Sequence, residues 1–264
     1  MRKSGESASD TGKGRGEDGR NSSPLEQVIC FDTLGTTIDL DAVELNKILF
    51  NHAEELGYSR TEIARLRSLY ENNRKDPAFL RESGRGKEEM VRRGLYQVKF
   101  FDDILEFLVK ATERGLRLVT VSKGGIEFLK AIYETRLPEP VTIEKKTYER
   151  YIDFLEVLST SVPEFKHQDK TAPACYMELV QNMYALGRQV LSYVSDDPKE
   201  TAAAQGASEM LKEQAQYPEL RAGIRVVLIS PEEHRIEGRR FTTSYDKGIY
   251  LSNNLPGVVD ISAG

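Results

Sequence analysis

The sequence predicts an α/β fold built on a parallel β-sheet. Four short and nearly continuous apolar runs have the composition of strands buried on both faces. They read VICF, LRLVTVS, VLSYVS and IRVVLIS and begin at Val28, Leu116, Val190 and Ile224. Segments with helical spacing precede the second and third runs. Alternation of buried strands with helices is typical of a parallel sheet that is covered by helices.

Two of the intervening helices have recognisable ends. The segment DDILEFLVKATERG carries apolar residues at helical spacing and stops at Gly115. The segment TAPACYMELVQNMYALG has Thr171 as the expected N-cap, Pro173 in the first turn and Gly187 as its stop. Each helix leads directly into a predicted strand, which is the order that a right-handed crossover between parallel strands requires.

Residues 40–99 depart from this alternation, because they contain helical patterns and no convincing strand. Asp41 can cap the segment AVELNKILFNHAEELG, and SRTE, which begins at Ser59, has the form of a capping box. We interpret residues 40–99 as a small helical domain inserted after the first strand. Residues 25–39 and 100–264 would then form the α/β core, within which residues 137–168 give no clear pattern.

Composition excludes several classes of protein. The 264 residues suffice for a sizeable core, and 39% hydrophobic and 30% charged residues are typical of a soluble globular protein. A net charge of -5 predicts no binding to nucleic acid or to an anionic membrane. No apolar run approaches the roughly 18 residues of a membrane helix. We expect a monomer or a homodimer, in which Cys30 and Cys175 are buried free thiols.

Residues 1–24 consist of Gly, Ser and mixed charges with almost nothing apolar. Such a segment cannot bury enough surface to offset its ordering entropy, so we predict a disordered tail. It lacks the apolar stretch of a signal peptide. Its four acidic residues argue against an organelle transit peptide. The expected location is therefore the cytoplasm.

Polar residues with possible chemical roles follow three of the predicted strands or precede the helix that leads into one. They are, in chain order, Asp32, Ser122, Lys123, Lys170, Asp196 and Asp197. Taken singly, each has a structural explanation as a turn former, a helix cap or a solvated charge. Ligands of open parallel sheets bind at the carboxyl ends of the strands. Their shared position at that edge therefore favours a functional site.

Four segments resemble, in order, the motifs of the haloacid dehalogenase (HAD) superfamily, which consists mostly of phosphatases with an aspartate nucleophile. They read FDTLGTT, TVSKGG, DKTAPACY and SDDPKETAAAQGA and span about residues 28–206. The motifs are nearest to those of enolase-phosphatases, which share GTT and K-T-x-x-x-x-Y, and of phosphonoacetaldehyde hydrolases, which read D-x-A-G-T-T. The resemblance implies a Rossmann-like sheet in which the helical insertion is the cap domain.

The resemblance also implies roles for particular residues. Asp32 would be the nucleophile that takes up the phosphoryl group, and Lys170 would neutralise the phosphoryl charge and hold Asp32. Ser122, Lys123 and the backbone from Gly124 onward would bind the phosphoryl oxygens, because N–H groups at a helix start attract anions. These groups would serve a small phosphorylated substrate.

The resemblance further implies a Mg²⁺ cofactor, since a hard cation takes oxygen ligands. The ligands would be Asp32, the backbone carbonyl of Leu34, Asp196, and Glu200 or Asp197. A cation would offset the repulsion between an anionic substrate and a carboxylate nucleophile. We therefore expect a Mg²⁺-dependent phosphatase that acts on a small phosphorylated metabolite.

Leu34 departs from the family pattern, because the phosphatases carry an acid at this position that protonates the leaving group. A non-catalytic binding protein is therefore an alternative, as is a hydrolase of C–P or C–halogen bonds, whose leaving groups do not need that proton. In the C–P case a cap lysine forms an imine with the substrate. Lys75 and Lys87 are available, although solvated helix charges are the interpretation that we favour for both.

Overall fold

The computed structural model describes residues 24–74, 76–229, 242–246 and 248–264. All of the predicted tail except Pro24 lies outside the described residues, and so does Lys75.

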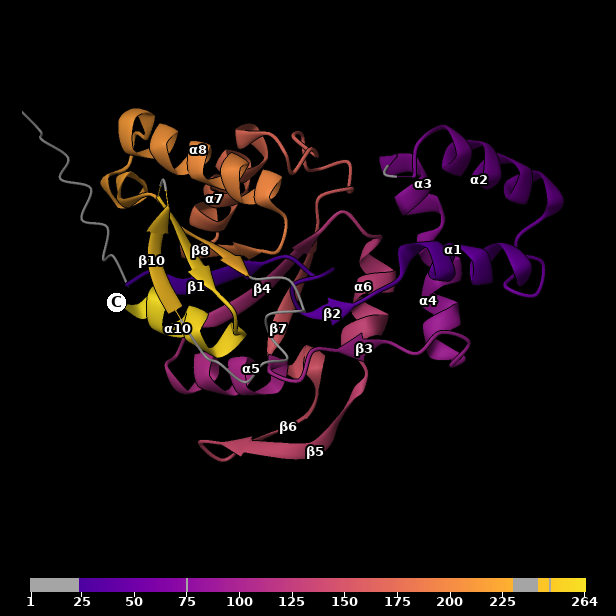
Figure 1. The fold of residues 1–264 in the computed structure, drawn as a ribbon, viewed down its shortest axis with the longest axis horizontal. Coiled ribbons are helices and arrows are strands. Elements are labelled where there is room, and N and C mark those ends of the chain that lie inside the picture. Colours follow the sequence, from indigo (N-terminus) through magenta and orange to yellow (C-terminus); the bar gives the residue numbers. More distant parts are fainter. Residues whose placement is uncertain (1–23, 75, 230–241, 247) are drawn as a thin grey trace, which may run out of the picture.

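A seven-stranded sheet runs through the centre of the protein in the order β10-β11-β9-β8-β1-β4-β7 (Figure 1). Six of these strands are parallel, and β10 pairs antiparallel with β11. The strands are β1 (Glu26–Phe31), β4 (Arg117–Ser122), β7 (Leu155–Ser159), β8 (Arg188–Ser195), β9 (Arg225–Ile229), β10 (Thr242–Asp246) and β11 (Ile249–Ser252). The predicted parallel sheet is confirmed, and the four predicted strands are β1, β4, β8 and β9.

Helices cover both faces of this sheet, with α5 and α10 on one face and α7 and α8 on the other (Figure 1). They span Ile104–Glu113 (α5), Pro173–Ala185 (α7), Pro198–Gln214 (α8) and Leu255–Ala263 (α10), and α6 covers Ile126–Tyr133. Alternate side chains of β1 enter the two separate cores, Ile29 and Phe31 on one side and Val28 and Cys30 on the other. This two-sided burial explains the continuous apolar run.

The described helices of residues 40–99 are α1 (Ala42–Asn51), α2 (Arg60–Asn72), α3 (Pro77–Glu82) and α4 (Gly84–Arg92). They extend from the core as a separate group (Figure 1), connected through the antiparallel pair of β2 (Ile38–Asp39) and β3 (Lys99–Phe100). The Asp41 side chain accepts hydrogen bonds from the N–H groups of Val43 and Glu44, and the capping box of Ser59 and Glu62 is present. Both predicted helix starts are confirmed.

Residues 137–168, which the sequence left without a pattern, hold a hairpin and an edge strand. The hairpin consists of β5 (Arg136–Ile143) and β6 (Lys146–Arg150), and a 3₁₀ turn (Tyr151–Asp153) then leads to β7. The prediction of Thr171 as a helix cap is wrong: α7 has Ala172 at its N-cap, while the Thr171 N–H and hydroxyl donate to Asp169. A second 3₁₀ turn spans Pro218–Ala222.

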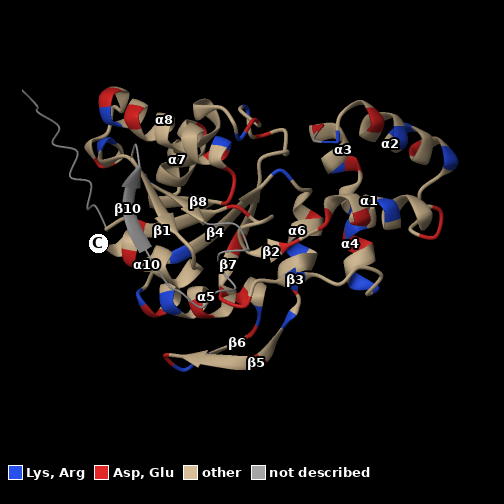
Figure 2. Cartoon of the chain, in the orientation of Figure 1, with Lys and Arg blue, Asp and Glu red and all other residues tan. Residues whose placement is uncertain are grey.

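Acidic and basic residues are interspersed along outer helices such as α2, α4 and α8 (Figure 2). Cys30 and Cys175 are free and buried, as predicted. None of the helices in the described residues is long and apolar enough to cross a membrane.

Candidate active site

Asp32 follows the central strand β1, where the chain turns sharply. The backbone N–H groups of Thr37 and Ile38 both donate to the carbonyl of Thr33, at 3.0 and 3.1 Å. Gly35 has a φ of +75°, and a Cβ at this position would lie 2.1 Å from the Asp196 carboxylate. Only glycine fits there. The turn thereby brings the chain after Asp32 against the carboxyl end of β8.

Hydrogen bonds between buried hydroxyl groups hold this turn in place. The Thr33 hydroxyl lies 2.6 Å from that of Thr120, and the Thr37 hydroxyl lies 2.8 Å from the Tyr133 hydroxyl. The Thr37 hydroxyl also contacts the Thr33 carbonyl at 3.0 Å. A fully bonded polar network in a dry interior rigidifies its surroundings. Sequence reasoning missed Thr120 and Tyr133, because nothing in a strand or helix pattern distinguishes them from ordinary core residues.

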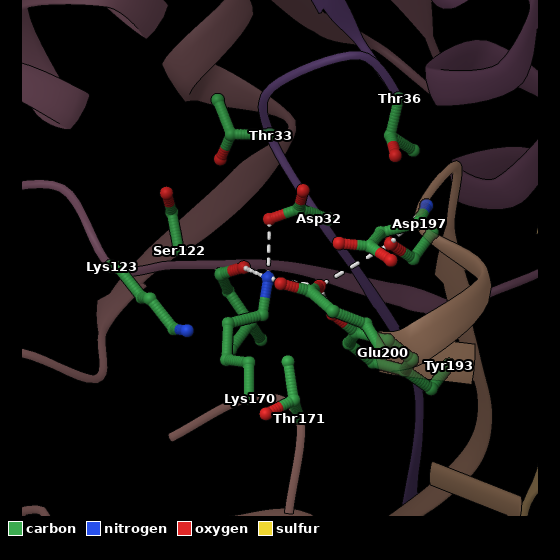
Figure 3. A network of polar contacts seen from close by, with 12 residues as sticks. Asp32, Thr33, Thr36, Ser122, Lys123, Lys170, Thr171, Tyr193, Asp197 and Glu200 are labelled. Atoms are coloured by element: carbon green, nitrogen blue, oxygen red, sulfur yellow. Dashed lines mark hydrogen bonds and ion pairs between the residues drawn. The ribbon is translucent and has the colours of Figure 1, made fainter. Parts of the chain in front are cut away.

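Lys170 joins the Asp32 carboxylate to the rest of the site (Figure 3). Its ammonium donates to Asp32 Oδ1 at 2.5 Å and to the Val121 carbonyl at 3.2 Å, and it lies 2.7 Å from Glu200 Oε2. Only 1% of Lys170 is exposed. The Tyr176 hydroxyl donates to the Lys170 carbonyl at 2.9 Å, which gives the tyrosine of the KTAPACY segment a structural role.

Glu200 belongs to the same buried network. Its Oε2 atom accepts from the Tyr193 hydroxyl at 3.0 Å and from the Ser195 hydroxyl at 3.3 Å, in addition to its contact with Lys170. Sequence reasoning missed Tyr193, whose position inside an apolar strand gave no sign of a polar contact. Glu200 thus serves to hold the lysine in place.

Burial and charge act in opposite directions on the central pair. Desolvation raises the pKa of the Asp32 carboxyl to about 7, against the attraction of Lys170, and Glu200 and Asp196 add repulsion. Burial alone would lower the pKa of Lys170, but Asp32 and Glu200 outweigh it and raise that pKa. Lys170 is therefore a permanent cation, and further positive charge beside Asp32 would favour its ionised form.

Asp196 and Asp197 follow β8 and face different partners. Asp196 Oδ1 accepts from the Thr36 hydroxyl at 2.9 Å, and the Asp196 N–H donates to the same hydroxyl at 3.1 Å. Asp197 caps α8 by accepting from the Lys199 N–H at 2.7 Å. The first threonine of the GTT segment, Thr36, therefore fixes Asp196, and the cap of α8 fixes Asp197.

The oxygen donors at this edge suit a small hard cation. No group of three or more His, Cys, Asp or Glu side chains in the described part of the chain is arranged to hold a metal ion. Mg²⁺ needs fewer, because it is usually bound through one or two carboxylates with waters and substrate phosphate. The carboxylates of Asp32 and Asp196, which line the same pocket, fit that requirement, and the Leu34 carbonyl stays a predicted ligand. Asp197 and Glu200, which were also predicted as ligands, are engaged in the cap and the lysine network.

Ser122 and the start of α6 form the other side of the site. The Ser122 hydroxyl accepts from the Gly124 N–H at 3.3 Å, and Ser122 is 3% exposed. Lys123 lies 3.5 Å from Asp169. Gly125 is the N-cap of α6 and has no side chain to occupy the helix start. Gly124 and Gly125 at this helix start line the pocket, where backbone N–H groups attract an anion.

All the predicted site residues line one pocket of about 390 Å³, which lies between the strand ends and the helices α1 to α4. They are Asp32, Leu34, Ser122, Lys123, Gly124, Lys170, Asp196, Asp197 and Glu200. The side chain of Leu34 stands in the pocket and is 37% exposed.

Lys87 of α4 also lines this pocket, and the interpretation of Lys87 as a solvated charge is wrong. It is 5% exposed, and its ammonium lies 4.7 Å from the centre of the Phe79 ring. Within the described ranges it forms no ion pair with a carboxylate. Burial lowers its pKa to about 7. At neutral pH a large fraction of Lys87 is therefore an uncharged amine.

No family model and no curated protein matches this sequence. Several solved structures match it. The Unknown transcript 4 protein of Saccharomyces cerevisiae aligns at 14% identity over 88% of this chain and 98% of that chain, with a TM-score of 0.54. A HAD phosphatase from Thermococcus onnurineus aligns at 17% identity over 91% of this chain and 99% of that chain, with a TM-score of 0.52.

The chain therefore has the fold of the haloacid dehalogenase superfamily, as its four motifs predict. The nearer likeness to enolase-phosphatases and phosphonoacetaldehyde hydrolases stays a prediction.

Proposed function

We propose that the protein is a hydrolase that moves the phosphoryl group of a small phosphorylated substrate to Asp32 and then to water. The observation that carries the proposal is the position of Asp32, which is held by a buried lysine at the carboxyl end of the central strand. Ser122 and Asp196 line the same pocket. A carboxylate, a fixed cation and a helix N-terminus together suit attack on phosphorus.

Each residue contributes a distinct part of the reaction. Lys170 binds Asp32 Oδ1, which leaves the second carboxylate oxygen to attack phosphorus. The bond from phosphorus to the leaving group breaks as the acyl phosphate forms, and water then hydrolyses that acyl phosphate. Ser122 and the N–H groups at the start of α6 would hold the phosphoryl oxygens. The buried Glu200 and Val121 contacts keep the Lys170 ammonium pointed at the reacting carboxylate.

Asp32, Asp196 and the Leu34 carbonyl would hold Mg²⁺, which when bound offsets the repulsion between the phosphoryl group and the carboxylates. Thr36 would keep Asp196 oriented toward the cation through its hydroxyl.

The test is a hydrolysis screen of phosphomonoesters, phosphonoacetaldehyde and a 2-haloacid, with Mg²⁺ and with a chelator. Asp32→Asn should lower turnover by more than about 10³-fold, as removal of a covalent nucleophile does. Its melting temperature should be unchanged or raised, because one of several crowded carboxylates becomes neutral. Asp260→Asn is the matched control, since Asp260 pairs with Lys110 and Arg114 outside the pocket. Residual Asp32→Asn activity within about tenfold of wild type would refute the proposal. A protein that binds phosphate but turns over nothing would favour the non-catalytic alternative.

A second candidate function, cleavage of a C–P bond, is favoured by the burial of Lys87 alone. An uncharged amine condenses with an aldehyde, loses water and forms an imine. Transfer of the phosphoryl group to Asp32 would then leave the electron pair of the C–P bond on an enamine, which needs no acid at position 34. Borohydride with phosphonoacetaldehyde should attach the reduced adduct at Lys87, detectable by mass spectrometry. Lys87→Met should give no adduct. Adducts spread over exposed lysines, with none at Lys87, would exclude this candidate.

A further inference from the structure

The pocket has two unlike ends. Its acids all lie at the strand ends, on the side of Asp32 and Asp196. The facing wall is mostly apolar and is assembled from the turn after β1, from α1 to α4, and from α6. Its apolar residues include Leu34, Leu40, Val43, Tyr70, Leu80 and Phe128. The wall therefore suits the part of a substrate that is not phosphorylated.

Part of this wall stays exposed in the folded chain. Val43 is 57% exposed and Leu34 is 37% exposed, which places both among the most exposed large hydrophobic residues of the described chain. Both line the same pocket. Exposed apolar side chains that gather in a concave site, rather than lying singly on the surface, mark the position of an apolar ligand group.

The polar groups of the facing wall are few. They are Asn46, Arg74, Lys87 and the hydroxyl of Tyr70. The Asn46 amide donates to the Ala42 carbonyl at 2.7 Å, whereas its Oδ1 atom has no partner within the described residues. None of the described residues of this wall is a carboxylate that could accept from hydroxyl groups. So few polar groups cannot pair with every hydroxyl of a sugar or polyol phosphate, and each hydroxyl buried without a partner is costly. The wall thus selects against the hydroxyl-rich phosphates.

Leu34 restricts the leaving group in a separate way. Leu34 is the pocket residue nearest to Asp32 in the sequence, and its side chain has no proton to donate. Without an acid at position 34, a leaving oxygen that is not protonated from elsewhere departs as an anion, and the loss of a general acid typically costs about 10² to 10⁴ in rate. A weakly basic oxyanion leaves without that help.

We infer that the pocket takes phosphate esters of an apolar hydroxyl compound whose oxyanion is weakly basic, of which aryl phosphates are the simplest. This inference rests on the proposed function. Asp32 forms a bond to phosphorus, the ester P–O bond breaks, and its electron pair stays on the aryloxide, which takes a proton from water. Water then cleaves the acyl phosphate to free Asp32 and phosphate, releasing the proton that balances the first step.

Binding tests the apolar wall without requiring turnover. The full chain is titrated calorimetrically, with Mg²⁺ present, with methylphosphonate, hexylphosphonate and phenylphosphonate. The two larger compounds should bind at least about tenfold more tightly than methylphosphonate. Val43→Ser should weaken their binding about threefold or more and leave methylphosphonate unchanged. Leu186→Ser is the matched control, because Leu186 is 66% exposed and does not line the pocket.

Turnover tests the leaving group. Phenyl phosphate should exceed hexyl phosphate in kcat/KM by about 10² or more, and glucose 6-phosphate should be the poorest substrate. Equal binding of the three phosphonates would overturn the inference, and so would equal turnover of phenyl phosphate, hexyl phosphate and glucose 6-phosphate. If hydrolysis still depends on Asp32 in that case, the proposed function stands. If no phosphonate binds and no ester is hydrolysed, the proposed function is wrong, and the inference falls with it.

Discussion

Two lysines in one pocket show how differently its two sides are built. Lys170, on the strand-end side, is 1% exposed and contacts two carboxylates, which raise its pKa. Lys87, on the helical side, is 5% exposed and packs over a phenyl ring, and burial lowers its pKa to about 7. Similar burial thus gives a permanent cation at one end and a partly neutral amine at the other.

The difference shows which side of the pocket has its charged groups already paired in the absence of a ligand. On the strand-end side each buried charge has a partner within the protein, so the groups are fixed in advance, as electrostatic catalysis requires. On the helical side a buried amine and exposed apolar side chains, among them Val43, carry an energetic cost that a ligand would relieve. Under the proposed function, the chemistry would belong to the core and the selection among substrates to the helices. Four variants test this division.

Lys170→Met should have the largest effect on stability. It leaves Asp32 and Glu200 facing each other without the cation between them, and removal of one partner of a buried pair costs about 3–5 kcal/mol. Urea unfolding at pH 8 measures the loss. Lys123→Met is the control, because Lys123 has a single contact at 3.5 Å with the exposed Asp169, and should change stability by less than about 1 kcal/mol. Equal losses for the two variants would show that the strand-end network is not the stabilising element.

Lys87→Met should stabilise the protein at pH 7. The pKa of Lys87 is about 7 when folded, against its ordinary value of 10.5, so the unfolded chain binds more protons between these values. The stability of wild type therefore rises with pH across that window. The advantage of Lys87→Met should be at most about 5 kcal/mol near pH 7 and should vanish above pH 10.5.

Unfolding of both proteins from pH 6.5 to 10 measures this slope. Lys130→Met removes an exposed lysine of α6, and its stability should change with pH in the same way as that of wild type. A Lys87→Met protein that is destabilised at pH 7 would mean that Lys87 has a partner in solution.

Leu34→Asp should raise the rate on esters with basic leaving groups, such as hexyl phosphate, by about tenfold to a hundredfold. The pKa of the new carboxyl would be raised by Asp32 and Asp196 nearby, which suits a proton donor. Phenyl phosphate, whose leaving group needs no proton, should gain little and serves as the internal control. A matching gain on both substrates would indicate that the variant acts on binding and not on the leaving group.

Gly125→Ala should have the smallest effect. A Cβ on Gly125 would lie 3.1 Å from the Cα of Gly84, where α4 meets the start of α6, and would push the helical group away from the core. We expect a loss of about 1 kcal/mol. Gly84→Ala is the matched control, because its Cβ would lie 3.4 Å from Gly125, an ordinary contact. Thermal melts of the two variants compare them directly, and a larger loss for Gly84→Ala would contradict this account.

The elements that the sequence did not predict share a physical reason. Strand β7 has the sequence LEVLS, and its Glu156 pairs with Arg117 and Arg188. As the edge strand of the sheet it lacks the continuous apolar run of the central strands. Strand β11 has only four residues, IYLS, and was too short to be recognised. Buried central strands can be recognised from their continuous apolar sequences, whereas edge strands depend on the strands with which they pair.

By itself the sequence determined that Asp32, Ser122, Lys170 and Asp196 meet at one edge. Ser122 ends its strand, Asp32 and Asp196 directly follow theirs, and Lys170 precedes the helix that leads into β8. The geometry of a parallel sheet brings the carboxyl ends of its strands together whatever the rest of the chain does. Only the tertiary structure decided the burial of Lys87 and the apolar wall of the pocket. The wall combines residues far apart in sequence, such as Val43 of α1 and Phe128 of α6, and Lys87 of α4 is buried against Phe79 of α3. Burial is a property of the assembled elements and not of any one segment.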